Sequence, residues 1–322
     1  MPNLNVAFLG APEYARGVGK RSTTSDIAFY DLKEGDVTVS MVEPAKYPEK
    51  LASLFFATSL ADAAIVVVDL ISPAFGETVI MLDCLGVRTG YIVLRNFIVP
   101  DQIAPLIKGT VLEGYEFIED DPVRLRGLLV ERAGSARSEQ ATAGSGSGSV
   151  AVDHFFDVKG VGTVVLGCVT EGNIRKHDKV KVLPEGKDAE IRSIQKHDDD
   201  FDLATKGDRV GLALKGVSVG DLDRGTVISN EDELISKSEI TAQAHLVKYW
   251  ANPLKEGMIV HVGHWMQFEP ARIESIDPSS NWKDPRLNLK LQKNLVYRSG
   301  SKAIATYLEG GKLRVIGSLD LK

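Results

Sequence analysis

Cysteine is scarce in this chain of 322 residues, which contains only Cys84 and Cys168. Each lies inside an apolar stretch, and no Cys/His cluster has the spacing of a metal site, so the sequence predicts no bound metal. Two buried thiols in so long a chain argue against a disulfide scaffold and indicate a reducing compartment. We therefore expect a cytoplasmic protein.

Long hydrophobic runs are missing too. The longest, AAIVVVDLI, is too short to span a bilayer. The amino-terminal MPNLNVAFLG lacks the basic region and long apolar core that a signal peptide needs. We expect no membrane partner.

An overall positive charge is also absent, because 38 Lys and Arg stand against 44 Asp and Glu, for a net charge of −6. This balance argues against a protein that coats phosphates generally. From residue 238 onward, however, 12 basic residues outnumber 8 acidic ones. A positive last third suits a nucleic-acid contact on one face, and a merely solvated basic domain explains the same count.

Strand-like and helix-like segments alternate over residues 1–132. NVAFL (5–9) reads as a strand, residues 27–44 as two strands joined by a turn, and residues 46–61 as an amphipathic helix. The continuous apolar run at 63–69 is typical of a parallel strand buried on both faces. This alternation predicts a layered α/β domain.

The pattern changes after a polar segment rich in glycine and serine at 133–149, which reads as a flexible linker. Short strands separated by Gly, Asp and Pro turns then fill 150–235 and predict a closed β-barrel. A second run of strands over 236–322 predicts another barrel of similar size. The expected architecture is one α/β domain followed by two β-barrels.

Three strings carry a family resemblance: SLADAAIVVVD (59–69), the segment 158–197 that begins VKGVGTVVLG, and KGDRVGLALKGVSVGDLDRGTVIS (206–229). Together with the domain order they resemble the translational GTPases. The pattern is most similar to SelB, the elongation factor that carries selenocysteinyl-tRNA, with elongation factor Tu next. The resemblance implies a P-loop GTPase-like α/β domain followed by barrels of the elongation factor Tu domain 2 and domain 3 types.

The phosphate loop of that family does not fit this chain. The motif G-x-x-x-x-G-K-[ST] wraps phosphates with backbone N–H groups and binds Mg²⁺ through its hydroxyl. Counted from Gly10, the second glycine is replaced by Ala15, and Gly19-Lys20 arrives four residues late, followed by Arg21. Only a few residues precede the next strand, so the helix that should follow the loop is missing.

The other nucleotide motifs also depart from the family. Glu43 stands for the Mg²⁺-binding Asp of D-x-P-G-H, Lys46 for its Gly and Tyr47 for its His, while Ile98 replaces the guanine-reading carboxylate of N-K-x-D. Residues 119–121, all acidic, replace the final Ser-Ala motif. This combination resembles archaeal SelB-like proteins with a degenerate nucleotide site. It predicts a pseudo-GTPase, not an enzyme, with no cofactor.

The first barrel keeps a second candidate site. The resemblance to SelB implies that Asp153, His154 and Arg209 form the pocket for the aminoacyl end of tRNA, where a selenolate would meet two cationic groups. The alternative is that Asp153 and His154 simply begin a strand while Arg209 pairs with a nearby carboxylate such as Asp208 or Asp223.

Three functional hypotheses follow. The first is a translation-factor-like protein that has lost GTP binding and hydrolysis and binds tRNA or a ribosome-associated partner, not DNA, through its barrels. The second is a divergent factor that binds GTP and Mg²⁺ through a rebuilt phosphate loop around Lys20. The third is a protein-interaction scaffold.

Overall fold

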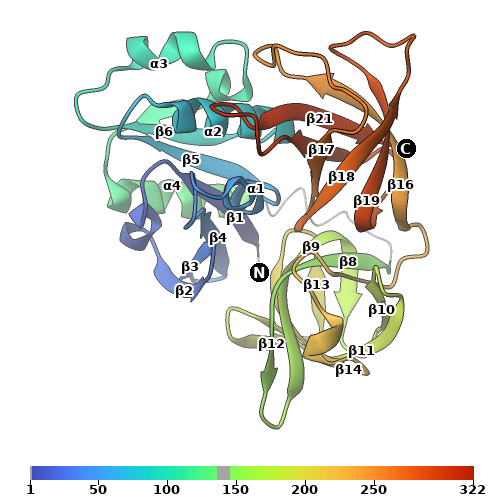
Figure 1. The fold of residues 1–322 in the computed structure, drawn as a ribbon. Coiled ribbons are helices and arrows are strands. Elements are labelled where there is room, and N and C mark those ends of the chain that lie inside the picture. The colour runs from blue at the N-terminus through green and yellow to red at the C-terminus, as the bar shows by residue number, and fades with distance from the viewer. Residues whose placement is uncertain (1, 136–145) are drawn as a thin grey trace.

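The computed structural model describes residues 2–135 and 146–322. Figure 1 shows the α/β domain on the left, the first barrel at the lower right and the last barrel at the upper right, all in mutual contact. Residues 136–145 of the predicted linker 133–149 lie outside the described residues. The ends of that segment are regular structure, since 133–135 finish a helix and 148–149 begin a strand.

The α/β domain is built on a seven-stranded sheet in the order β2-β3-β4-β1-β5-β6-β7. Strands β4, β1, β5, β6 and β7 run parallel, whereas β2 and β3 are antiparallel additions at one edge. The strands are β1 Asn3–Leu9, β2 Lys20–Thr24, β3 Ala28–Glu34, β4 Val37–Glu43, β5 Ala63–Val68, β6 Gly90–Leu94 and β7 Glu116–Ile118.

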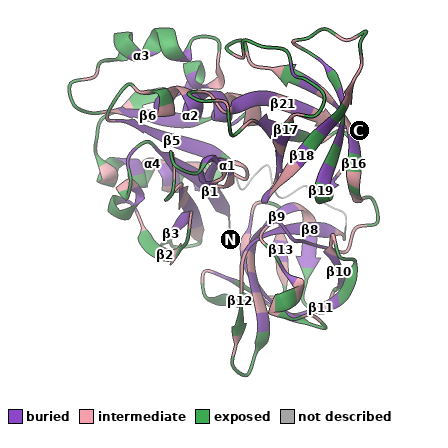
Figure 2. Cartoon of the chain, in the orientation of Figure 1, coloured by how far each residue is buried: buried purple, intermediate pink, exposed green. Residues whose placement is uncertain are grey.

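Helices cover both faces of this sheet. Alternate side chains of β5 explain why its sequence is apolar throughout: Ala64 and Val66 pack with α1, α2 and α3, while Ile65 and Val67 pack with α4. Figure 2 shows the central strands as buried. None of the helices among the described residues combines the length and apolar character that crossing a bilayer requires. The helices are α1 Leu51–Thr58, α2 Pro73–Leu85, α3 Pro100–Ile107 and α4 Pro122–Ser135, with 3₁₀ turns η1 Tyr14–Gly17 and η2 Val111–Gly114.

Both predicted barrels are present. In the first, β10-β15-β8-β9-β14-β11 form a ring that closes through β10 and β11, β12 extends β11, and β13 pairs with β9. Its elements are β8 Gly148–Val158, β9 Gly162–Arg175, β10 Lys179–Leu183, β11 Lys187–Lys196, β12 Asp199–Phe201, β13 Leu203–Thr205, β14 Arg209–Lys215, η3 Val219–Asp221 and β15 Val227–Ser229.

The last barrel is closed in the order β16-β19-β18-β17-β20-β21. Its strands are β16 Ile235–Leu246, β17 Ile259–His264, β18 Gln267–Ile276, β19 Arg286–Tyr297, β20 Lys302–Thr306 and β21 Val315–Leu321. The expected α/β-barrel-barrel architecture is confirmed.

The sequence predicted that no α-helix follows the loop after β1, and the structure has none there. The loop forms the single 3₁₀ turn η1 and then enters strand β2, whose first residue, Lys20, is exposed. Close packing explains Gly10 and Gly19 of the loop. A Cβ on Gly10 would overlap the carbonyl oxygen of Val67, and one on Gly19 would overlap the Met41 side chain.

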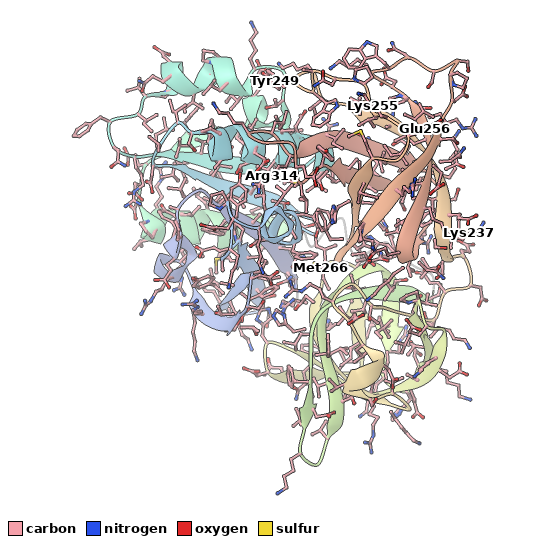
Figure 3. All side chains as sticks on the ribbon, viewed as in Figure 1. Lys237, Tyr249, Lys255, Glu256, Met266 and Arg314 are labelled. Carbon is pink, nitrogen blue, oxygen red and sulfur yellow. The ribbon has the colours of Figure 1, made fainter. Side chains whose placement is uncertain are left out.

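The α/β domain and the last barrel share one apolar core. Leu54 and Phe55 of α1 belong to the same buried cluster as Met266 and Ile304 of the last barrel. Gly263 of β17 leaves room for the Phe55 ring, because a Cβ there would come within 2.6 Å of a ring carbon. Figure 3 shows Met266 at the junction of the three domains. Continuous packing of this kind resists relative movement of the domains.

Candidate functional site

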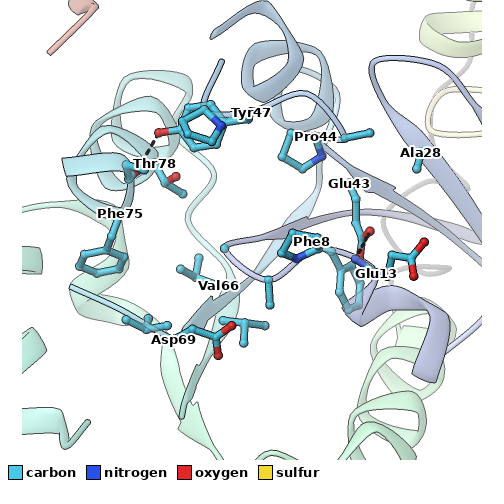
Figure 4. Close-up of a pocket in the computed structure, with 18 of the residues that line it drawn as sticks. Phe8, Glu13, Ala28, Glu43, Pro44, Tyr47, Val66, Asp69, Phe75 and Thr78 are labelled. Atoms are coloured by element: carbon cyan, nitrogen blue, oxygen red, sulfur yellow. Dashed lines mark hydrogen bonds between the residues drawn. The ribbon is translucent and has the colours of Figure 1, made fainter. Parts of the chain in front are cut away.

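A cleft of about 430 Å³ lies at the carboxyl ends of β1, β4 and β5. Open α/β sheets bind ligands at this edge, and it is where the GTPase resemblance places a nucleotide. Figure 4 shows the side chains of Pro44, Tyr47, Val66 and Phe75 around the hollow, so much of its wall is apolar.

Glu43 closes the part of this cleft where a phosphate would bind. Its carboxylate accepts the backbone N–H of Glu13 at 2.9 Å, the backbone N–H of Ala15 at 2.7 Å and the hydroxyl of Tyr30 at 3.1 Å. Glu13 has φ 61° and leads into a right-handed turn, the backbone form of an anion-binding nest. Burial raises the pKa of the Glu43 carboxyl, and the hydrogen bonds from Ala15, Glu13 and Tyr30 act against that rise because they stabilise the charged form. The chain thus supplies its own anion to the loop.

The positions that replace D-x-P-G-H are engaged within the fold as well. The backbone N–H of Lys46, in place of the glycine amide, donates to the carbonyl of Asp26 at 3.2 Å and the hydroxyl of Ser53 at 3.1 Å. The Tyr47 hydroxyl donates to the carbonyl of Ala74 at 2.8 Å. Burial raises the pKa of this hydroxyl. Neither group is free to contact a phosphate or a water molecule beside one.

An ion-pair network lies after β6 and β7, where the N-K-x-D motif of the family would bind the guanine base. Arg95 lies 2.9 Å from Asp120 and 3.4 Å from Asp69, and the Tyr14 hydroxyl donates to Asp120 at 2.8 Å. Ile98 is half-buried and packs against the domain core. The acidic segment after β7 is therefore partly neutralised by an arginine of the neighbouring turn.

The structure brings Asp153, His154 and Arg209 together. Arg209 makes a bidentate ion pair with Asp153, at 2.5 and 3.0 Å, and His154 Nδ1 donates to the same carboxylate at 2.6 Å. Burial acts to raise the pKa of the Asp153 carboxyl, but Arg209 and His154 together hold it below its usual value. Arg209 does not pair with Asp208 or Asp223, because Asp208 pairs with Lys196 and Asp223 with Lys293, each at 2.5 Å; the nearby carboxylate that it pairs with is Asp153.

This triad packs against the α/β domain, and Arg209 also lines a groove between that domain and the first barrel. The guanidinium of Arg209 stacks 3.7 Å from the Phe29 ring centre, and His154 Nε2 lies 3.2 Å from the hydroxyl of Ser25. The cavity lined by Asp153 and Arg209 at this junction holds only about 30 Å³. In this domain arrangement the triad acts as an interdomain contact.

Two interdomain ion pairs were not predicted from the sequence. Arg224 of the first barrel makes a bidentate pair with Asp26, at 2.6 and 2.7 Å, across 198 residues. Arg314 of the last barrel pairs with buried Glu77 of α2 at 2.6 Å, across 237 residues. Arg224 lies inside a string that carries the resemblance, yet nothing in the sequence indicates the partner of either arginine.

A second groove, also about 430 Å³, runs between the β2–β3 hairpin and the outside of the first barrel. Exposed Phe156 and Val161 form apolar parts of its wall, and Gln195 and His197 supply polar groups. His197 Nε2 is buried without a hydrogen-bond partner among the described residues, and burial lowers the pKa of this imidazole. Sequence reasoning did not select His197, which follows an ordinary strand.

Comparison with known proteins supports the architecture. The family model of elongation factor Tu domain 2 matches residues 162–229. An uncharacterized protein of Methanocaldococcus jannaschii is 33% identical over 319 residues, which cover 98% of this chain and 99% of that protein. The selenocysteine-specific elongation factor of the same organism is 26% identical over 285 residues, which cover 83% of this chain but only 61% of the factor.

Solved structures show the same fold. The apo crystal structure of translation elongation factor SelB from Methanococcus maripaludis superimposes with a TM-score of 0.82 at 21% identity, over 99% of this chain and 79% of that one. The same factor in complex with the GTP analogue GPPNHP gives a TM-score of 0.80 at 21% identity, over 100% of this chain and 79% of that one.

Proposed function

The chain belongs to the SelB and elongation factor Tu family of translation factors, and from this premise we propose that it works without a GTP switch and binds tRNA or a ribosome-associated partner through its β-barrels. The observation that carries the proposal is the Glu43 carboxylate in the loop that would hold a phosphate.

The residues of the cleft do not fit GTP and Mg²⁺. A terminal phosphate would need the N–H groups of Glu13 and Ala15, which already bind a carboxylate, and it would be repelled by that carboxylate at close range. Arg21 stands where a metal-binding hydroxyl would follow the lysine, and its guanidinium pairs with Glu13 at 2.9 Å. Without a bound nucleotide there is no GTPase activity, so we propose a protein that is not an enzyme.

The groove beside the first barrel supports the RNA-binding half of the proposal. It offers an exposed aromatic ring, Phe156, and a buried imidazole nitrogen of His197 that still lacks a partner. A stacking surface next to an unused polar group suits the unpaired end of an RNA, whose base has a flat face and polar edges. The adjoining Asp153–Arg209 pair fixes the barrel wall behind the groove.

Calorimetric titration with GTP or GDP in the presence of Mg²⁺ is expected to give no binding heat, because the chain's own carboxylate fills the phosphate position. Millimolar nucleotide should also leave the melting temperature unchanged, whereas a ligand at a hundred times its Kd would add about 2.7 kcal/mol of stability. The protein is first analysed for co-purified nucleotide. Micromolar binding would establish the alternative of a rebuilt phosphate loop around Lys20.

Filter-binding titration with total tRNA is expected to show binding that weakens steeply as salt rises, since phosphate contacts release counterions. Phe156→Ser should weaken it about tenfold through loss of base stacking. Val123→Ser, which removes an exposed apolar side chain from α4, should bind as the parent does. Absence of salt-sensitive binding at micromolar protein would refute the RNA assignment.

A further inference from the structure

The buried carboxylate of Glu43 joins three segments of the α/β domain. It extends from the end of β4, and Glu43 is only 5% exposed. The carboxylate accepts the backbone N–H groups of Glu13 and Ala15, in the loop after β1, and the hydroxyl of Tyr30 on β3. Hydrogen bonds from backbone N–H groups favour the charged form of a carboxyl. One buried anion therefore ties the loop, β3 and β4 together.

Glu43 lies at the end of the β3–β4 ladder, next to the turn of the β2–β3 hairpin. It is paired with Ala28, the first residue of β3, and this is the last pair of the ladder among the described residues. The turn at 25–27 comes directly before Ala28. Backbone pairing between β3 and β4 thus stops where the turn begins. Contacts made beyond the ladder therefore hold the turn to the rest of the domain.

The same turn docks the α/β domain on the first barrel. The Asp26 carboxylate pairs with Arg224, whose guanidinium also donates to the Ser25 hydroxyl at 3.1 Å. Just after the turn, the Phe29 ring packs under the Arg209 guanidinium. These contacts come from one short stretch of the α/β domain, so the position of the turn decides whether they can form.

Two connections lead from Glu43 to this docking turn. Through Tyr30, the carboxylate fixes β3 close behind the turn. In the chain shortly after Glu43, the backbone N–H of Lys46 and the hydroxyl of Ser53 both donate to the Asp26 carbonyl, at 3.2 and 2.5 Å. Asp26 thus contacts the barrel with its carboxylate and the segment after β4 with its carbonyl. The anion-binding loop and the docking turn share these supports.

We propose that the Glu43 carboxylate is a built-in ligand that keeps the docking turn, and with it the α/β domain, permanently in place on the first barrel. The inference rests on the proposed loss of the GTP switch and deepens it, because it names the group that fixes the loop in place of a bound phosphate. Loss of the carboxylate would leave two backbone N–H groups and the Tyr30 hydroxyl open to the cleft, which Arg21 also lines. Such donors bind a small oxyanion, so an added carboxylate ion should replace the missing one.

The variant Glu43→Ala in the full chain, studied with and without sodium acetate, tests the built-in ligand. Without acetate, the backbone amides of Glu13 and Ala15 should exchange hydrogen at least about tenfold faster than in the parent, because each loses its acceptor. The melting temperature should fall by about 3 °C or more, as loss of buried hydrogen bonds predicts. Acetate at about 100 mM should reverse both changes, since a ligand that binds only the folded chain stabilises it. The parent, whose site is filled, should not respond to acetate.

Two further variants separate an anion site from general loss of stability. Ser53→Ala removes a buried hydroxyl beside the same turn, and its lower melting temperature should not respond to acetate, because it opens no anion site. Glu43→Gln keeps the shape of the side chain without its charge, and should speed exchange of the Glu13 and Ala15 amides about threefold, since charged acceptors bind more strongly. Acetate should not slow this exchange, because the amide group fills the site. Sodium chloride at the same concentration controls for ionic strength.

A double variant tests the connection to the barrel. Glu43→Ala should lower the melting temperature less in an Arg224→Ala background than in the parent, because the docking turn is already released there. Losses that simply add overturn the link between the loop and the turn. Exchange at Glu13 and Ala15 that acetate does not slow in Glu43→Ala overturns the built-in ligand. If Glu43→Ala folds neither with nor without acetate, unchanged exchange in Glu43→Gln overturns it. GTP binding by the parent contradicts the loss of the switch, so the two proposals fail on different measurements.

Discussion

Replacement of Arg314 by alanine is expected to lower the free energy of unfolding by about 3–5 kcal/mol, the usual cost of leaving a buried charge without its partner. Glu77 is only 3% exposed and accepts hydrogen bonds from the Arg314 backbone N–H at 2.9 Å, from Nε at 3.1 Å and from Nη2 at 2.6 Å. Figure 3 shows Arg314 where the last barrel meets the α/β domain. Equilibrium denaturation in urea measures the change.

Two further variants separate the buried charge from general effects of arginine loss. Arg286→Ala removes an exposed arginine from the same barrel and should change stability by no more than about 0.5 kcal/mol. Glu77→Gln/Arg314→Met removes both charges and should recover much of the loss, since a buried ion pair is often replaceable by groups of similar volume. A loss below about 1 kcal/mol for Arg314→Ala would show that the two domains do not depend on this pair.

Replacement of Arg209 by alanine is expected to cost a similar amount, about 3–5 kcal/mol. Asp153 is 3% exposed, and its carboxylate takes both Nη groups of Arg209 in addition to the His154 ring. The variant also removes the guanidinium that stacks on Phe29 of the α/β domain. Thermal and chemical denaturation should both detect the loss.

The controls for Arg209 distinguish a structural contact from an open ligand pocket. Arg192→Ala, at an exposed arginine of the same barrel, should be nearly neutral. Asp153→Asn/Arg209→Met should be more stable than Arg209→Ala alone, because no unpaired carboxylate remains buried. Full stability of Arg209→Ala combined with weaker tRNA binding would instead make the triad a ligand site.

The architecture could be predicted from the sequence because its signals are local. Strand and helix periods, the apolar run at 63–69 and the turn-rich barrels each depend on neighbouring residues. The departure from the phosphate-loop motif could also be predicted, because that motif requires particular residues at a fixed spacing. Too few residues separate Lys20 from the next strand to form the helix that follows such a loop. Local chemistry thus determined the layered domain, the two barrels and the altered nucleotide motifs.

Only the tertiary structure decided how the altered positions are used. Glu43 reads as a failed metal ligand in the sequence, and the fold turns it into the anion that binds the loop. The partners of Arg224 and Arg314 lie 198 and 237 residues away, so their pairing depends on how the domains dock. The exposure of Phe97 depends likewise on a turn that a hydrogen bond from Asn96 ties to the loop after β5. Contacts between distant segments follow from packing of whole domains, which no local pattern in the chain encodes.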